Sequence, residues 1–309
     1  MKVKSVAVIG ECMVELQKAG EGYKQSFGGD TLNTALYLAR QTKDLNVNIN
    51  YLTGMGKDPF SRSMIDSWKK EGITTSSIYI SDTKLPGMYA IETSPDGERN
   101  FYYWRNDAAA RFWIREYTPE KLASLLSQSD FLYLSGISLA ILPEDCLDIL
   151  FEALTIYKKG NGKIAFDNNY RPTLWGSKLQ TQEVYKRILS LTDIAFLTYD
   201  DEELLYGDTS EQQSIERTQK LGVGEIVVKR GAEACFVITQ DEGFIEVPAN
   251  QVLSVVDTTA AGDSFSAGYL AKRLTGGTMQ ESALAGHLLA GTVIQYPGAI
   301  IPTHAMPLL

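Results

Sequence analysis

The alternation of short apolar runs with segments of helical periodicity constrains the fold of this chain more than any other feature. The apolar runs are rich in β-branched and aromatic residues, and they span residues 5–9, 48–52, 131–134, 163–166, 193–197 and 225–228. Such runs are typical of parallel strands that are buried on both faces. Helical periodicity occupies residues 119–126, 143–157, 181–190 and 214–221. The pattern predicts an α/β fold with a doubly wound, mainly parallel sheet and helices on both of its faces.

One stretch departs from this alternation. Residues 87–105 contain two alternating runs that are joined by the sequence Ser-Pro-Asp-Gly, which is typical of a β-hairpin. With the segment at about 11–27, a hairpin at about 87–106 is expected to form a small β-sheet that projects from the body as a lid.

Because 309 residues with 44% hydrophobic content can build one large core, we expect a single main domain over residues 1–309.

Charge and cysteine usage restrict the partners. The formal net charge is -9 and no run of Lys and Arg is present, which argues against a nucleic-acid partner. Cys12, Cys146 and Cys235 are far apart and suggest neither a disulfide framework nor a zinc site. The first residues lead directly into a predicted strand without a secretory signal, and no apolar run has membrane-spanning length. We therefore expect a cytoplasmic protein that acts on small molecules.

The strongest local motif is DTTAAGDSFSAGYLAKRL at residues 257–274, in which small residues lead directly into a helix. The N–H groups of Ala261, Gly262 and Asp263 are expected at the start of this helix. They would be unsatisfied there and would lie at the positive end of the helix dipole, which suits a phosphate group. From the turn alone, Asp263 has two interpretations, a helix cap or a catalytic residue.

A second motif, FGGDTLNTALYLAR, places Gly28 and Gly29 immediately before another predicted helix. Paired glycines either form a tight turn or allow the backbone to approach a ligand closely. The adjacent Asp30 and Asn33 favour a ligand rich in hydroxyl groups. No Walker A loop is present and no GxGxxG follows the first predicted strand, so phosphate binding would depend on the turn described above.

These two motifs, in this order, resemble the two signatures of the ribokinase-like (PfkB) carbohydrate kinases. Further segments are similar to the members of that family that act on keto-deoxy sugar acids: GEC near Gly10, LPGMYAIET, GERNFYYWRN, YLSGISLAIL, FDNNYRPTLW, VVKRGA and VIQYPGAIIP. The resemblance covers nearly the whole chain, and it implies a ribokinase-like fold and transfer of a phosphoryl group from ATP to the terminal hydroxyl of a sugar acid. A kinase for a neutral ketose such as fructose, or a sugar-binding regulator without turnover, remains an alternative.

The resemblance also implies roles at the phosphoryl-transfer site. Asp263 would be the general base that takes the proton of the substrate hydroxyl, and Ala260, Ala261 and Gly262 would form the anion hole. The nucleotide contacts implied beyond this turn are Asn169, Lys229, Gly231 and His287. His287 also fits a structural, partly buried histidine, because its neighbours on the predicted helix are apolar.

Magnesium is expected to arrive with ATP and to keep most of its waters, without a dedicated metal site. Where the family usually carries an Asn-x-x-Glu motif, this chain has Thr198 and Asp201. Ala260 also stands where many members carry Gly, and Glu15 stands where ribokinase carries a sugar-binding Asp. The differences at Ala260 and Glu15 weaken a ribokinase assignment but are compatible with a kinase for a keto-deoxy acid. Asp201 keeps the carboxylate of the metal-linked motif, and its alternative interpretation is a surface helix cap.

The residues implied for sugar binding are Gly29, Asp30, Asn33, Tyr89, Tyr103, Arg105 and Arg171, together with Asp263. The strand period supports part of this set, because it places Phe101, Tyr103 and Arg105 on one face and Tyr102 and Trp104 on the other. A guanidinium beside an aromatic ring suits the carboxylate of a sugar acid, whereas the alternative is a surface ion pair of Arg105. Similar kinases pair their lids between subunits, so we expect a homodimer or an assembly of dimers.

Overall fold

The computed structural model describes residues 3–93, 99–239 and 243–309. Its main sheet has the strand order β15-β14-β13-β12-β11-β10-β1-β4-β6. The strands are β1 (Ser5–Ile9), β4 (Asn48–Leu52), β6 (Ile73–Thr74), β10 (Phe131–Ser135), β11 (Lys163–Asp167), β12 (Ile194–Thr198), β13 (Glu225–Lys229), β14 (Cys235–Thr239) and β15 (Gly243–Val247). Neighbours from β6 to β13 are parallel, and β14 and β15 continue the sheet in antiparallel pairing. The predicted parallel sheet is confirmed, with an antiparallel edge that the sequence analysis did not include.

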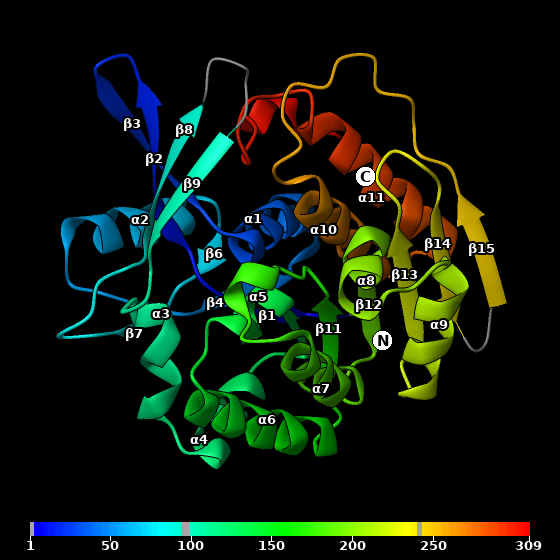
Figure 1. Ribbon diagram of the computed structural model, residues 1–309, viewed down its shortest axis with the longest axis horizontal. Coiled ribbons are helices and arrows are strands. Elements are labelled where there is room, and N and C mark those ends of the chain that lie inside the picture. Colours follow the sequence, from blue (N-terminus) through cyan, green and yellow to red (C-terminus); the bar gives the residue numbers. More distant parts are fainter. Residues whose placement is uncertain (1–2, 94–98, 240–242) are drawn as a thin grey trace.

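Helices cover both faces of this sheet, because successive side chains of each strand point to opposite sides. In β1, Val6 and Val8 belong to one hydrophobic core, and Ala7 and Ile9 belong to the other. The first core is completed by α1 (Asp30–Thr42), α2 (Pro59–Lys70), α10 (Ala261–Arg273) and α11 (Met279–Val293). The second is completed by α3 (Ala109–Phe112), α4 (Pro119–Leu126), α5 (Gly136–Ala140), α6 (Glu144–Lys159), α7 (Lys178–Leu189), α8 (Tyr199–Tyr206) and α9 (Glu211–Lys220). The doubly wound arrangement is visible in Figure 1.

Local sequence signals explain where the helices begin. Helix α4 begins at Pro119, whose fixed backbone angle suits a first helical position, and the hydroxyl of Thr118 accepts a hydrogen bond from the N–H of Lys121. The short elements are the pair β5 (Gly54–Met55) and β7 (Tyr79–Ile80) and the 3-10 turns Lys43–Leu45, Trp113–Glu116, Pro172–Leu174 and Thr303–Ala305. Within the described residues, no helix is both long enough and apolar enough to cross a membrane.

A second sheet, called the small sheet below, has the order β3-β2-β8-β9. Its strands are β2 (Met13–Ala19), β3 (Gly22–Gly28), β8 (Met88–Thr93) and β9 (Arg99–Trp104). Figure 1 shows these strands projecting away from the body of the molecule. Strands β8 and β9 are antiparallel with Tyr89 opposite Tyr103, as the hairpin prediction requires. The predicted Ser-Pro-Asp-Gly turn of that hairpin lies outside the described residues.

Candidate active site

The N-termini of α1 and α10 meet beyond the carboxyl ends of the parallel strands, which is where open α/β sheets generally bind ligands. The side-chain amide of Asn33 in α1 donates a hydrogen bond of 2.9 Å to the carboxylate of Asp263 in α10. The hydroxyl of Thr34 donates to the backbone carbonyl of the same aspartate, at 3.3 Å. The two motifs that the sequence analysis singled out are therefore in direct contact.

Asp263 does not cap its helix. Helix α10 begins at Ala261 after Ala260 as the N-cap residue, and Asp263 lies within the first turn. The pKa of Asp263 is raised to about 8, chiefly because the carboxylate is buried and secondly because of the negative charge of Asp30. The hydrogen bond from Asn33 and the charge of Lys229 act in the opposite direction. A buried carboxylate with such a perturbed pKa, located in a cavity, has the properties of a general base.

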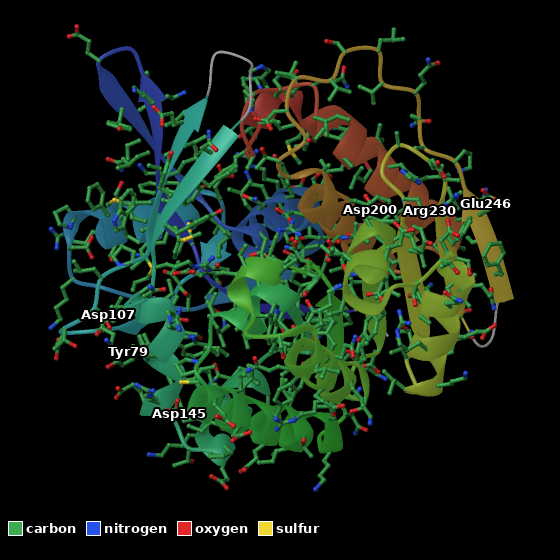
Figure 2. All side chains as sticks on the ribbon, viewed as in Figure 1. Tyr79, Asp107, Asp145, Asp200, Arg230 and Glu246 are labelled. Atoms are coloured by element: carbon green, nitrogen blue, oxygen red, sulfur yellow. The ribbon has the colours of Figure 1, made fainter. Side chains whose placement is uncertain are left out.

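One cavity, called the α10 cavity below, has a volume of about 310 Å³ and opens at the N-terminus of this helix. Its lining includes Asn169, Lys229, Gly231, Ala261, Gly262, Asp263 and His287. Thr198, Asp201 and Arg171 also line it, as do Asp200 and Arg230, which are labelled in Figure 2. Ala260 is buried behind the lining. The structure therefore places the implied nucleotide contacts around a single cavity, while their roles remain predictions.

Asp167, at the end of β11, is a residue of this cavity that the sequence analysis missed. One of its carboxylate oxygens accepts hydrogen bonds from the ammonium of Lys229 and the hydroxyl of Ser266, both at 2.8 Å, and from Tyr133 at 3.2 Å. The other oxygen, Oδ1, is buried without a partner. Its position as the first polar residue after a predicted strand was a signal that could have identified it.

His287 combines both interpretations that the sequence allowed. It lines the α10 cavity, but its Nε2 atom lies 3.1 Å from the backbone carbonyl of Val247 and its ring packs edge-on against Phe265. Burial lowers the pKa of His287, so that the neutral ring is favoured. The imidazole is thus held in place by the protein and still presents one surface to the cavity.

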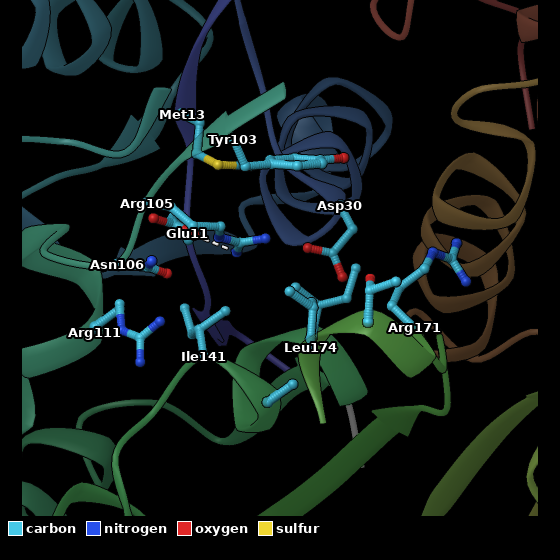
Figure 3. A pocket seen from close by; sticks show the side chains of 14 residues that line it. Glu11, Met13, Asp30, Tyr103, Arg105, Asn106, Arg111, Ile141, Arg171 and Leu174 are labelled. Carbon is cyan, nitrogen blue, oxygen red and sulfur yellow. Dashed lines mark hydrogen bonds and ion pairs between the residues drawn. The ribbon is translucent and has the colours of Figure 1, made fainter. Parts of the chain in front are cut away.

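A second cavity, of about 400 Å³, lies between the small sheet and the body and is called the small-sheet cavity below (Figure 3). Of the implied sugar contacts, it is lined by Gly29, Asp30, Tyr103, Arg105 and Arg171. It is also lined by Glu11, Asn106 and Arg111, which the sequence analysis did not identify. Asn106 and Glu11 stand in the segments GERNFYYWRN and GEC, which carry the resemblance but gave neither residue a role, and Arg111 stands outside these segments.

Three sugar contacts implied by the resemblance, Asn33, Tyr89 and Asp263, do not line this cavity, and Asp263 lines the α10 cavity instead. Asn33 is directed to Asp263, as described above. The hydroxyl of Tyr89 donates to the carboxylate of Glu15, and its ring centroid lies 5.7 Å from that of Tyr103. Gly29 is required by packing, because a Cβ atom there would collide with the backbone carbonyl of Glu11.

Arg105 is buried, and its guanidinium forms an ion pair with the buried carboxylate of Glu11. The alternative interpretation placed the ion pair of Arg105 at the surface, and this is wrong because the pair is buried. The Nε atom of Arg105 is buried without a partner. The predicted proximity to Tyr103 is observed, with the guanidinium carbon 5.9 Å from the ring centroid.

Hydrogen bonds connect the two cavities. Asn169 lines the α10 cavity and Asp30 lines the small-sheet cavity. The side-chain amide of Asn169 donates a hydrogen bond of 2.9 Å to the carboxylate of Asp30. Burial raises the pKa of Asp30, against the effect of hydrogen bonds from Ser135 and Asn169. Arg171 lines both cavities and lies 3.6 Å from the carboxylate of Asp201. A ligand in one cavity would thus lie beside a ligand in the other.

Comparison with known proteins agrees with this geometry. The pfkB family of carbohydrate kinases matches residues 3–306, and the chain belongs to this family. Two similar proteins carry the name 2-dehydro-3-deoxygluconokinase. The one from Dickeya dadantii is 53% identical, and the match covers 99% of this chain and 100% of that protein. The one from Escherichia coli K12 is 52% identical, and the match covers 98% of this chain and 99% of that protein. A protein of Escherichia coli solved in complex with ATP and Mg²⁺ has a TM-score of 0.81 at 21% identity, over 98% and 96% of the two chains.

Proposed function

We propose that this chain transfers the terminal phosphoryl group of ATP to the terminal hydroxyl of 2-keto-3-deoxygluconate, giving the 6-phospho product. This compound is the 2-dehydro-3-deoxygluconate in the names of the two relatives, which match the chain over its whole length. The observation that carries the proposal is the position of Asp263, in the α10 cavity and in contact with Asn33 from the helix that begins beside the small-sheet cavity. A base at this junction can reach a hydroxyl on one side and a phosphate on the other.

Phosphoryl transfer depends mainly on positioning and on the stabilisation of negative charge. In the proposed mechanism, the Asp263 carboxylate takes the proton of the attacking hydroxyl. The N–H groups of Gly262 and Asp263 in the first turn of α10 and the Lys229 ammonium face the phosphoryl oxygens. The N–H of Ala261 was expected to be unsatisfied as well, but it donates a hydrogen bond of 3.1 Å to the carbonyl of Thr258. Because Lys229 is held by Asp167, its charge is fixed in place before the nucleotide binds. Protein groups would therefore provide both proton acceptance and an anion-binding surface.

We propose that Mg²⁺ enters with ATP. Magnesium prefers oxygen ligands and retains several of its waters, and the unpartnered Oδ1 of Asp167 together with Asp201 offers carboxylate oxygens at the α10 cavity. Among the described residues, no group of three or more His, Cys, Asp or Glu side chains could hold a metal ion alone. When bound, the ion would neutralise charge on the phosphate oxygens.

A kinase for a neutral ketose is the alternative enzyme. The small-sheet cavity contains Arg105 and Arg111, and a neutral sugar brings no anion to these guanidinium groups. A regulator without turnover is disfavoured by Asp263, because a binding protein has no need for a buried carboxylate whose ionisation is opposed by burial.

The use of ATP fits a cytoplasmic location, and the net charge of -9 argues against a nucleic-acid partner.

Measurement of ADP release with a panel of sugar acids and neutral sugars tests the proposal. We expect 2-keto-3-deoxygluconate to give the highest kcat/KM, with fructose far below it. A preference for fructose would replace the proposal by the neutral ketose kinase, and ATP-independent sugar binding without ADP release would favour the regulator.

We further propose that the active assembly is a homodimer, or is built from dimers, with the small sheet in the contact.

A further inference from the structure

Three buried polar atoms without hydrogen-bond partners lie on residues at one end of the small-sheet cavity. They are Oε1 of Glu11, Nε of Arg105 and Nε of Arg111. A buried polar atom left unsatisfied destabilises a protein, so such atoms are usually satisfied by a ligand or by ordered water. The phosphoryl-transfer mechanism uses none of the three. Their clustering in one cavity therefore indicates a site for a polar group of the substrate.

The charges at this end of the cavity do not balance. Arg105 is neutralised by Glu11, with which it forms an ion pair. Arg111, carried by α3, makes no hydrogen bond or ion pair within residues 3–93, 99–239 and 243–309 and contacts the ring of Phe112, 5.8 Å from its guanidinium carbon. Two guanidinium groups against one carboxylate leave one net positive charge. A single carboxylate on the ligand would balance it.

The position of this charge also fits the chemistry of a six-carbon sugar acid. Figure 3 shows Glu11, Arg105, Asn106 and Arg111 on one side of the cavity, and Asp30 and Arg171 on the other. The second side is connected to the α10 cavity, through the hydrogen bond between Asp30 and Asn169. In 2-keto-3-deoxygluconate the carboxylate and the phosphorylated hydroxyl are at opposite ends of the carbon chain. The substrate can therefore reach both sides at once.

We propose that Arg111 is a specificity-determining residue, which binds the substrate carboxylate together with Arg105 while Glu11 fixes the orientation of Arg105. The proposal rests on the proposed function and assigns the substrate's two ends to the two sides of the small-sheet cavity. A planar guanidinium can form two parallel hydrogen bonds with a carboxylate, so two arginines give directional recognition. The free oxygen of Glu11 remains available to accept a hydrogen bond from a sugar hydroxyl.

The test compares 2-keto-3-deoxygluconate with its neutral primary amide in wild type and in Arg111→Leu. We expect Arg111→Leu to lower kcat/KM for the acid by about ten- to a hundredfold, mainly through a higher KM, the range for losing a charged hydrogen bond. Turnover of the amide should change little. Arg111→Lys keeps the charge but not the planar fork, and should restore part of the preference for the acid.

Arg115→Leu provides a matched control four residues further along. Arg115 pairs at the surface with Asp145, which is labelled in Figure 2, and it does not line the cavity. This variant should keep the acid-to-amide ratio of wild type. If Arg111→Leu does not fold, the ratio of kcat/KM for the acid to kcat/KM for the amide is measured in Arg111→Gln and Arg111→Lys instead.

The possible outcomes separate this inference from the proposed function. An unchanged acid-to-amide ratio in the Arg111 variants, or an equal loss for both substrates, would overturn the role of Arg111 while leaving a working kinase. A wild type that does not phosphorylate the acid would overturn the proposed function itself, and with it this inference.

Discussion

At the scale of single residues, the site depends on placing charged groups where water cannot solvate them. Asp263, Asp30 and Asp167 are carboxylates around one junction. Burial and the negative charges of neighbouring carboxylates raise the pKa of Asp263 and the pKa of Asp30. Lys229 and Asn33 offset part of this effect. The protein therefore holds its proposed base in a state from which a proton is readily exchanged near neutral pH, and this has consequences for both rate and stability.

Replacing Asp263 by Asn should separate these two consequences. Loss of a general base typically lowers turnover by at least about a hundredfold, while ATP binding should be largely retained because the helix N-terminus is unchanged. The folded-state pKa of about 8 lies above the ordinary value of 3.8, so ionised Asp263 lowers stability increasingly as pH rises through this window. The Asn variant should therefore have an equal or higher Tm at pH 9, measured by calorimetry. Near-wild-type turnover would remove the assignment of the base.

The pH dependence of kcat/KM offers an independent check, because it reports ionisations of the free enzyme. A base with a pKa of about 8 is mostly protonated below that pH. We expect kcat/KM to fall by about tenfold per pH unit below 8 and to level off above it. Asp30→Asn removes a negative charge that raises this pKa, and should move the midpoint to lower pH. A flat profile between pH 6 and 9 would contradict the role of Asp263.

Arg105 requires a variant design that takes its partner into account. In Arg105→Leu the buried carboxylate of Glu11 loses its counterion, and breaking a buried pair typically lowers the free energy of unfolding by about 3–5 kcal/mol. The double variant Arg105→Leu, Glu11→Gln should recover most of that stability in urea unfolding. Preference for the acid over a neutral ketose should remain low in both. If the single variant is as stable as wild type, the pair is not buried as described.

At the scale of elements, sequence patterns predicted the framework because strands and helices in an α/β fold are encoded locally. The run at residues 48–52 became β4 with the same bounds, and residues 119–126 became α4. The antiparallel strands β14 and β15 were not predicted, although Cys235–Thr239 and Gly243–Val247 are both short β-rich runs. Strand β14 pairs with β13, and β15 pairs with β14. Both pairings join strands that are adjacent in the sequence, so a search for consecutive β-rich runs could have found them.

The site contains residues that stand in local sequence motifs and residues whose role depends on contacts between distant parts of the chain. Asp263 and Gly29 could be identified because each stands in a motif next to a helix start. Asp167 could also have been identified, as the first polar residue after a predicted strand. Glu11 and Arg111 could not, because their significance depends on contacts across the chain, such as the pair of Glu11 with a residue 94 positions away. Helix packing supports these contacts: a Cβ atom on Gly268 in α10 would lie 2.7 Å from the carbonyl oxygen of Ala285 in α11. The close approach of the two helices fixes the position of the turn that carries Asp263.

At the scale of the whole molecule, the substrate site is shared between the body and a sheet that projects from it. Tyr103 and Arg105 reach the small-sheet cavity from β9 and the residue after it, while Gly29 and Asp30 reach it from the start of α1. Any movement of the small sheet would therefore change the shape of the cavity. A contact that holds the sheet in place would contribute directly to substrate binding.

The small sheet has the features of a surface that is covered by a second copy of the chain. Strand β9 is at an edge of the sheet, and Tyr102 and Trp104, on the face opposite Tyr103, are 49% and 62% exposed. Unpaired strand edges and exposed aromatic side chains favour association, and two-fold symmetry would let the same surface meet itself.

We expect light scattering to show a dimer, or a multiple of dimers, at micromolar concentration. The double variant Tyr102→Glu, Trp104→Glu should shift the protein to monomers and raise the KM for the sugar acid, because the small sheet then loses its support. Leu179→Glu, at an exposed apolar residue of α7, is a control that should leave the assembly unchanged. A wild type that scatters as a monomer would exclude the proposed contact, and a dimer that survives the double variant would place the interface elsewhere.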